Sequence, residues 1–321
     1  MKVAFAGTPE AALLVLRALA EAGHEIIAVI TEPDRPAGRG QKLYAPPVKV
    51  GALRRGLPVF QPEYVNALEF LAPLRALAPE ALVVMAYGQK LKPALLSLPR
   101  HGCYNVHPSL LPKYRGAAPV AWALLQGETE TGVTIFRMNE GMDTGDILLQ
   151  RRVAILPDEN TDQLTTRLAE IGAEMAVETL EMVRTGAAQC RPQNDAEATF
   201  ARALRKEDGL INWRHEAECV RNLVRAMTPW PGAFTFHHPA QGSAQRLIVL
   251  RTRVRHDVGE QAREPGTVVR ADREGLLVAA ADGAVELLEV KPAGGRAMDG
   301  AAFVRGRRVQ VGDRLGTESN Q

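Results

Sequence analysis

The 321-residue sequence has few cysteines and lacks a long apolar run. Its three cysteines, Cys103, Cys190 and Cys219, lie far apart and show no metal-ligand spacing. This favours a reducing cytoplasm and argues against a structural zinc site. No stretch approaches the roughly 20 apolar residues of a membrane-spanning helix, so we expect no membrane segment. The chain opens directly on a predicted strand, which leaves no room for a targeting peptide.

A dinucleotide-binding motif is also absent. The first predicted strand, residues 2–6, is followed by Gly7, Thr8 and Pro9 and not by the G-x-G-x-x-G sequence that cradles a pyrophosphate. This argues against an NAD-dependent dehydrogenase.

The net charge is only +2 and is unevenly distributed. Residues 201–321 carry 19 Lys and Arg side chains against 15 Asp and Glu, whereas residues 1–200 carry 20 against 22. A positive C-terminal part is compatible with a polyanionic partner, although many ordinary domains carry a similar excess.

The order of predicted elements indicates an α/β domain over residues 1–188. Apolar runs alternate there with helical patterns, as a parallel α/β sheet requires. The strand candidates are residues 2–6, 25–31, 81–86, 102–107, 132–138 and 147–155. A helix is expected over 9–22, with Thr8 as its N-cap and Pro9 at its first position. A second, longer helical pattern covers 161–185.

The remaining sequence indicates a small β-barrel. Residues 189–206 lose periodicity and are predicted to be a linker. A helix over 214–227 follows, and then come short β-type runs separated by Gly, Pro and Asp. These runs are residues 233–237, 246–254, 266–271, 275–279 and 284–290. Five or six short strands with turn signals predict a barrel within residues 207–321.

Two polar residues lie at the C-terminal end of the buried strand candidate at 102–107. Strand alternation places Asn105 and His107 on one side of the backbone, at the strand end where open α/β sheets bind ligands. An amide donor beside an imidazole suits acyl transfer, because the amide can stabilise an oxyanion and the imidazole can move a proton. From these residues alone, a turn cap at Asn105 and a core histidine at His107 are the alternative interpretation.

Two loops add further candidates. In residues 139–146, glycines flank Asp143 and Thr144, so the loop could aim a carboxylate at His107 and fix its tautomer. A plain hairpin turn is the alternative, and spacing does not choose between Asp143 and Asp146. The long loop over 32–43 carries basic residues among glycines, which suits phosphate contact but equally suits a solvated surface loop.

At these residues the sequence resembles the methionyl-tRNA formyltransferase family, part of the folate-dependent formyltransferase superfamily. The stretches that match in order are residues 5–9, 33–43, 83–88, 105–112, 115–119, 132–146, 229–231 and Trp213. The superfamily shares the stretches around His107 and Asp143, so these indicate the chemistry. The resemblance implies a Rossmann-like formyltransferase domain with a mostly parallel sheet, followed by an OB-type β-barrel.

The same resemblance implies the roles of individual residues. Asn105, His107 and Asp143 would form the catalytic set, with no metal. The donor would be 10-formyltetrahydrofolate, and its site would be lined by Ser109, Leu110, Leu111 and Pro112. The acceptor would be initiator methionyl-tRNA, contacted by the barrel and by Arg35, Arg39 and Lys42 of the 32–43 loop. We expect a cytoplasmic monomer.

Two alternatives remain at this point. The same catalytic set could serve a sugar nucleotide or a purine precursor, although those relatives lack the combination of basic loop and basic barrel. A non-catalytic RNA-binding module is a second alternative, but such a module has no need of Asn105, His107 and Asp143.

Overall fold

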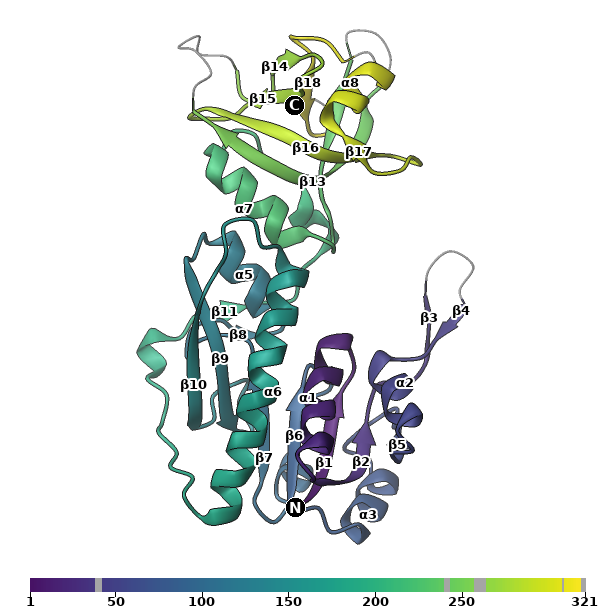
Figure 1. Ribbon diagram of the computed structural model, residues 1–321, viewed down its shortest axis with the longest axis vertical. Helices are drawn as coiled ribbons and strands as arrows, with labels where there is room; N and C mark the ends of the chain where they lie inside the picture. Colours follow the sequence, from purple (N-terminus) through teal and green to yellow (C-terminus); the bar gives the residue numbers. More distant parts are fainter. Residues whose placement is uncertain (38–41, 240–242, 257–263, 308, 319–321) are drawn as a thin grey trace. The chain divides into compact units, whose positions relative to one another are not determined.

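The computed structural model describes residues 1–37, 42–239, 243–256, 264–307 and 309–318, which form two compact units (Figure 1). The first unit comprises Met1–Pro119, Glu130–Ala154 and Thr165–Ala201. The second unit comprises Val120–Thr129, Ile155–Leu164 and Arg202–Gln321. The segment predicted as a linker is therefore divided, with residues 189–201 in the first unit and 202–206 in the second.

The first unit is built on a seven-stranded sheet in the order β10-β9-β7-β6-β1-β2-β5. The strands are β1 Lys2–Gly7, β2 Glu25–Ile30, β5 Val59–Phe60, β6 Ala81–Met85, β7 Cys103–His107, β9 Glu130–Arg137 and β10 Ile147–Ala154. The strands from β5 to β7 pair in parallel, and β9 and β10 add antiparallel pairs at one edge. This confirms the predicted mostly parallel sheet; β5 was not predicted.

Helices bury both faces of this sheet. They are α1 Glu10–Glu21, α2 Pro47–Arg54, α3 Leu68–Ala76, α4 Pro93–Leu96 and α6 Thr161–Thr185. Successive residues Val3 and Ala4 of β1 are both 0% exposed, which explains why the strand reads as one apolar run. A Cβ at Gly172 of α6 would lie 2.5 Å from Cγ1 of Val106, so glycine lets this helix approach β7 closely. None of the described helices is long and apolar enough to cross a membrane.

Thr8 is not the N-cap of α1, contrary to the prediction. Pro9 occupies that position and makes no side-chain cap bond. The Thr8 hydroxyl instead donates to the Tyr87 carbonyl at 2.7 Å and accepts from the Glu32 N–H at 3.4 Å. It therefore connects the chain where β1, β2 and β6 end, and these tertiary partners compete successfully with a local cap.

Short strand pairs complete the first unit. They are the antiparallel pair β3 Arg35–Ala37 with β4 Lys42–Tyr44, and the parallel pair β8 Arg115–Gly116 with β11 Phe200–Ala201. A 3₁₀ turn, η1 Asp195–Glu197, precedes β11. The pair β8–β11 thus joins residues about 85 positions apart in the sequence.

The second unit contains the predicted barrel. Its strand order is β14-β15-β16-β13-β12-β18, with β17 paired to β16. The strands are β12 Ala233–His238, β13 Gln245–Arg255, β14 Val268–Ala271, β15 Leu276–Ala279, β16 Ala284–Pro292, β17 Met298–Asp299 and β18 Arg314–Gly316. Val268 donates to the Asp313 carbonyl at 2.8 Å and Leu315 to that of Gly266 at 2.7 Å, which nearly closes the sheet.

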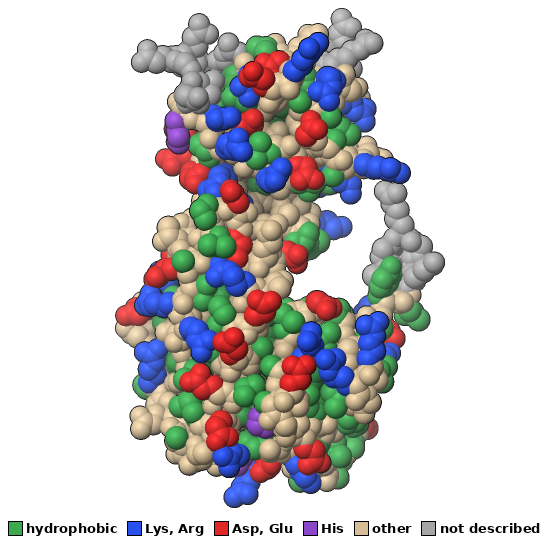
Figure 2. All heavy atoms as spheres, in the orientation of Figure 1, with side chains coloured by type: hydrophobic (Ala, Val, Ile, Leu, Met, Phe, Trp, Pro, Cys, Tyr) green, Lys and Arg blue, Asp and Glu red, His purple; other side chains and the backbone are tan. Residues whose placement is uncertain are grey.

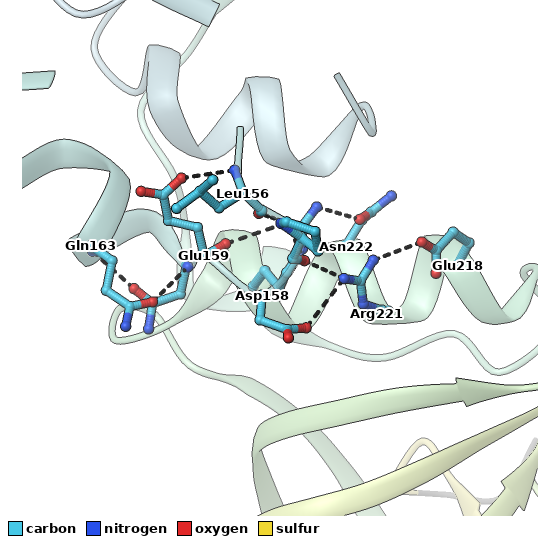
Figure 3. Close-up of polar contacts among 10 residues, drawn as sticks. Leu156, Asp158, Glu159, Gln163, Glu218, Arg221 and Asn222 are labelled. Atoms are coloured by element: carbon cyan, nitrogen blue, oxygen red, sulfur yellow. Dashed lines mark hydrogen bonds and ion pairs between the residues drawn. The ribbon is translucent and has the colours of Figure 1, made fainter. Parts of the chain in front are cut away.

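Helices pack against the barrel strands in this unit. They are η2 Lys206–Gly209, α7 Ala217–Met227 and α8 Gly300–Arg307. The helix α5 Pro119–Leu125 also belongs to this unit from Val120 onward. The Arg221 guanidinium of α7 lies 2.7 Å from the Glu218 carboxylate and 3.4 Å from that of Asp158, and it also donates to the Pro157 carbonyl. Figure 3 shows Arg221 between these two carboxylates. One turn further, Arg225 donates to the Pro157 carbonyl at 2.9 Å. Burial, followed by the charge of Arg221, lowers the pKa of Arg225.

Candidate active site

Residues with unusual backbone conformations follow the carboxyl ends of β6 and β7, at one edge of the first sheet: Ala86 has a φ of 48° and Tyr114 a φ of 62°. Asp143, with a φ of 55°, lies in the β9–β10 loop, and its carboxylate lies 3.8 Å from His107 at the end of β7. Such conformations cost free energy and concentrate at functional sites. This is also the edge where open α/β sheets bind ligands.

His107, the last residue of β7, is only 4% exposed, and its ring nitrogens face different partners. Nε2 lies 3.0 Å from the Tyr114 carbonyl oxygen. Because a carbonyl only accepts, Nε2 carries the hydrogen of the neutral ring and Nδ1 keeps its lone pair. Nδ1 lies 3.8 Å from Oδ2 of Asp143, an ion-pair distance longer than a hydrogen bond. Tyr114 therefore fixes the tautomer, and Asp143 faces the nitrogen that can take up a proton.

The Asp143 carboxylate is held in place through the backbone. Its Oδ2 accepts a 2.8 Å hydrogen bond from the N–H of Gly116. A Cβ at Gly145 would lie 1.8 Å from the Arg137 carbonyl oxygen, so the turn that follows Asp143 requires glycine. The Asp146 side chain is exposed, and its backbone carbonyl accepts from Arg137. The structure therefore brings Asp143 to His107 and leaves Asp146 outside.

Asn105 lies two residues before His107 on β7, between Val84 of β6 and Phe136 of β9 in the strand register. Alternation along the strand puts the Asn105 and His107 side chains on the same face. The Asn105 side chain is partly exposed, and within the described ranges its amide has no hydrogen-bond partner. Its donors are therefore available to a ligand.

The four residues predicted to line the folate site form a tightly bonded turn. Ser109 is fully buried and donates to the Lys113 carbonyl at 2.7 Å. Thr134 of β9 donates to the Ser109 carbonyl at 2.6 Å and accepts from the Leu111 N–H at 3.1 Å. The turn contains a cis peptide bond between Leu111 and Pro112. A contact of Ser109, Leu110, Leu111 or Pro112 with the donor stays a prediction.

Two of the three predicted tRNA-contacting residues, Arg35 and Lys42, belong to the paired strands β3 and β4. Arg35 is exposed, with its guanidinium 3.2 Å from the Glu63 carboxylate. Lys42 is the first residue of β4. Arg39 lies outside the described residues. A role of these three residues in RNA binding stays a prediction.

A buried phenol lies at the same sheet edge. The Tyr87 hydroxyl has no hydrogen-bond partner among the described residues. Burial, with a smaller contribution from the Glu32 carboxylate, raises the pKa of Tyr87 well above its ordinary value. The phenol is therefore neutral throughout the physiological range.

Sequence reasoning did not single out the residues that hold the site together. Arg115 is 4% exposed and donates to Oε1 of Gln193 at 2.8 and 3.1 Å. The same guanidinium donates to the Asp195 carboxylate at 2.6 Å. In the sequence, residues 115–119 are only a stretch that matches the family, and no spacing rule connects Arg115 to Gln193, 78 positions later.

Comparison with known proteins shows the family to which the chain belongs. The formyl transferase family matches residues 1–180, and the formyl transferase C-terminal domain matches residues 203–308. The chain therefore belongs to the formyl transferase family, a family of enzymes, as the resemblance predicted. Within that family it is 45% identical to methionyl-tRNA formyltransferase of Geobacter sulfurreducens over 316 residues, 98% of this chain and 97% of that protein.

Solved structures share the fold at lower identity. HypX from Aquifex aeolicus matches 97% of this chain with 18% identity and a TM-score of 0.64, and the chain covers 48% of HypX. The sugar 3N-formyl transferase WlaRD, solved in the presence of dTDP and 5-N-formyl-THF, matches 89% of this chain. That match has 18% identity, a TM-score of 0.61 and covers 97% of WlaRD.

Proposed function

We propose that this chain transfers the formyl group of 10-formyltetrahydrofolate to the amino group of methionine on initiator tRNA, before translation initiation. The observation that carries this proposal is the 45% identity to a methionyl-tRNA formyltransferase across 98% of the chain, which includes both the catalytic and the barrel regions. The match to the sugar formyl transferase has only 18% identity and supports the fold alone.

The geometry supports a mechanism for the reaction. The uncharged methionine amine attacks the formyl carbon, and Asn105 donates to the oxyanion that forms. Nδ1 of His107 takes the proton that the amine loses, and the Asp143 carboxylate faces the resulting imidazolium. The bond between the formyl carbon and N10 then breaks, and the proton passes to N10. The products are formylmethionyl-tRNA and tetrahydrofolate.

The remaining assignments follow from this function. Residues 1–188 would form the catalytic domain, 189–206 a linker and 207–321 the tRNA-binding barrel. The basic loop with Arg35, Arg39 and Lys42 would contact the acceptor end, mainly through phosphates. Ser109, Leu110, Leu111 and Pro112 would line the folate site. The enzyme would act in the cytoplasm as a monomer, without a metal.

The deciding experiment compares acceptors with one donor. Formyl transfer from 10-formyltetrahydrofolate is measured to charged initiator tRNA, charged elongator methionine tRNA, free methionine and a dTDP-linked amino sugar. We expect transfer to initiator tRNA alone. Transfer to the amino sugar, with none to charged tRNA, would assign the chain to the sugar branch and overturn the proposal.

A further inference from the structure

The 193–201 segment, which contains η1 and β11, contacts both loops of the catalytic pair. The sequence predicts that this segment is part of an interdomain linker. In the fold, β11 pairs in parallel with β8, and Ala201 accepts from the N–H groups of Ala117 at 2.8 Å and Ala118 at 3.2 Å. A Cβ at Gly116 would lie 2.6 Å from the Ala201 carbonyl oxygen, so the segment approaches as closely as glycine permits.

Gln193 connects this segment to the Asp143 loop. Its Nε2 donates to the carbonyls of Asp143 at 2.8 Å and Gly145 at 2.7 Å. Its Oε1 accepts from the buried Arg115 guanidinium, which has only donors. Arg115 therefore sets the orientation of the amide, because the oxygen must face Arg115 and the two N–H groups must face the loop. Both carbonyls flank the backbone turn in which Asp143 adopts a φ of 55°.

Thr199 connects the same segment to the residues that hold His107. Its hydroxyl accepts from the Tyr114 N–H at 2.9 Å, and its carbonyl accepts from the Arg115 N–H at 2.9 Å. The Tyr114 carbonyl accepts a hydrogen bond from His107 Nε2. Gly116, two residues after Tyr114, donates its backbone N–H to the Asp143 carboxylate. Residues 114–116 thus contact both members of the catalytic pair, and Thr199 fixes the backbone of these residues.

We propose that Gln193 and Thr199 are positioning residues that set the separation of His107 and Asp143. The inference deepens the proposed function and rests on the formyl transfer chemistry, although it does not depend on which amine is the acceptor. Gln193 acts on the Asp143 backbone, and Thr199 acts on the segment that holds both side chains. Neither touches the reacting atoms.

The test uses full-length variants with matched shapes. Gln193→Met keeps the length of the side chain but removes its hydrogen bonds, and Thr199→Val keeps the branched shape but removes the hydroxyl. We expect each to lower kcat by roughly 10- to 100-fold, because a misplacement of about 1 Å costs on that order. The KM values for donor and acceptor should change by less than about twofold. Thr199→Ser keeps the hydroxyl and should restore most of kcat.

A double-mutant cycle separates positioning from a purely structural role. If Gln193 acts through the Asp143 carboxylate, Gln193→Met should lower kcat further by less than about twofold once Asp143→Asn is present. Equal losses in both backgrounds would overturn the proposal for Gln193. Asn194→Ala is the control within the segment, because Asn194 contacts Ala196 and Glu197 but neither catalytic loop. It should keep the kcat of the unmodified enzyme.

Failure of this inference is distinguishable from failure of the proposed acceptor. If the unmodified enzyme formylates an amino sugar and not charged tRNA, the same variants are measured with the sugar, since His107 and Asp143 serve either amine. If the unmodified enzyme formylates tRNA but Gln193→Met and Thr199→Val keep its kcat, the acceptor assignment stands and the positioning role is wrong.

Discussion

The backbone N–H of Gly116 donates a 2.8 Å hydrogen bond to Oδ2 of Asp143, the same oxygen that lies 3.8 Å from Nδ1 of His107. This hydrogen bond orients Oδ2 toward the imidazole. The ring hydrogen of His107 is on Nε2 and is donated to the Tyr114 carbonyl on the other side of the ring. A negative charge thus faces the basic nitrogen, and the nitrogen stays free to accept a proton.

Asp143→Asn should lower kcat without unfolding the protein. The amide oxygen can still accept from Gly116, but the neutral side chain cannot stabilise an imidazolium. We expect a loss of roughly 10²- to 10⁴-fold, the range for positioned proton transfer. Single-turnover formyl transfer with saturating donor measures this step.

The matched control for this variant is Asp146→Asn, in the same loop. The Asp146 side chain is exposed, and the structure places it away from His107. A kcat loss in Asp146→Asn as large as that in Asp143→Asn would show that loop charge, and not the pairing with His107, is responsible.

Asn105→Ala should also lower kcat, for a different reason. Its amide has no partner within the described structure, so its loss leaves no unpaired group inside the protein. Removal of one oxyanion donor typically costs about 10²- to 10³-fold in kcat. Asn105→Asp keeps the shape but removes both N–H groups and should be at least as slow. Near-normal turnover in either variant would contradict the oxyanion role.

The sequence predicted the parts of the site whose signals are local. Asn105 and His107 stand out because they are polar residues at the end of a buried strand, and Asp143 lies in a glycine-flanked loop. The family resemblance was still needed to choose Asp143 over Asp146, since spacing does not reveal which carboxylate points inward. The fold class followed from runs of apolar residues that belong to strands buried on both faces.

The parts that escaped prediction depend on contacts between distant segments. Gln193 and Thr199 lie 50 and 85 positions from their partners Asp143 and Tyr114, in a stretch without periodicity. Thr8 was assigned to a local helix cap, but tertiary partners take its hydroxyl. Such side-chain bonds leave no periodic pattern in the sequence.

The three cysteines should differ in reactivity. Cys103 is buried in β7, and burial raises its pKa from an ordinary 9.0 to about 12, whereas Cys190 and Cys219 are exposed. The thiolate is the reactive form. At pH 8 we therefore expect rapid alkylation at the exposed Cys219 and Cys190. Cys103 should react only after unfolding.

Mass-spectrometric mapping of native and guanidinium-treated protein tests this order, and fast native labelling of Cys103 would contradict it.

The raised pKa of Cys103 also predicts a pH dependence of the free energy of unfolding. Below about pH 9 the Cys103 thiol is protonated in both the folded and the unfolded state, so a change of pH there does not alter its contribution to stability. As the pH rises from about 9 toward 12, the unfolded state releases a proton that the folded state retains, so the Cys103 contribution to stability falls.

Arg225 should stabilise the second unit through backbone carbonyls. Its guanidinium donates to the Pro157 carbonyl at 2.9 Å and to the Asn222 side chain at 2.8 Å, joining α7 to the loop before α6. Hydrogen bonds from a charged donor contribute about 1.5–3 kcal/mol, so Arg225→Met should lower the free energy of unfolding by about 2 kcal/mol. Arg225→Lys should lose less, because the ammonium can still reach one carbonyl.

Tryptophan fluorescence during urea unfolding measures this effect in the second unit. The three tryptophans, Trp122, Trp213 and Trp230, all belong to that unit, so the signal reports on it directly. Arg305→Met is the control, because Arg305 is exposed on α8 and its replacement removes the same charge. The control should keep the midpoint of the unmodified protein. If Arg225→Met keeps that midpoint as well, the hydrogen bonds of Arg225 make no net contribution to the free energy of unfolding, and the prediction is wrong.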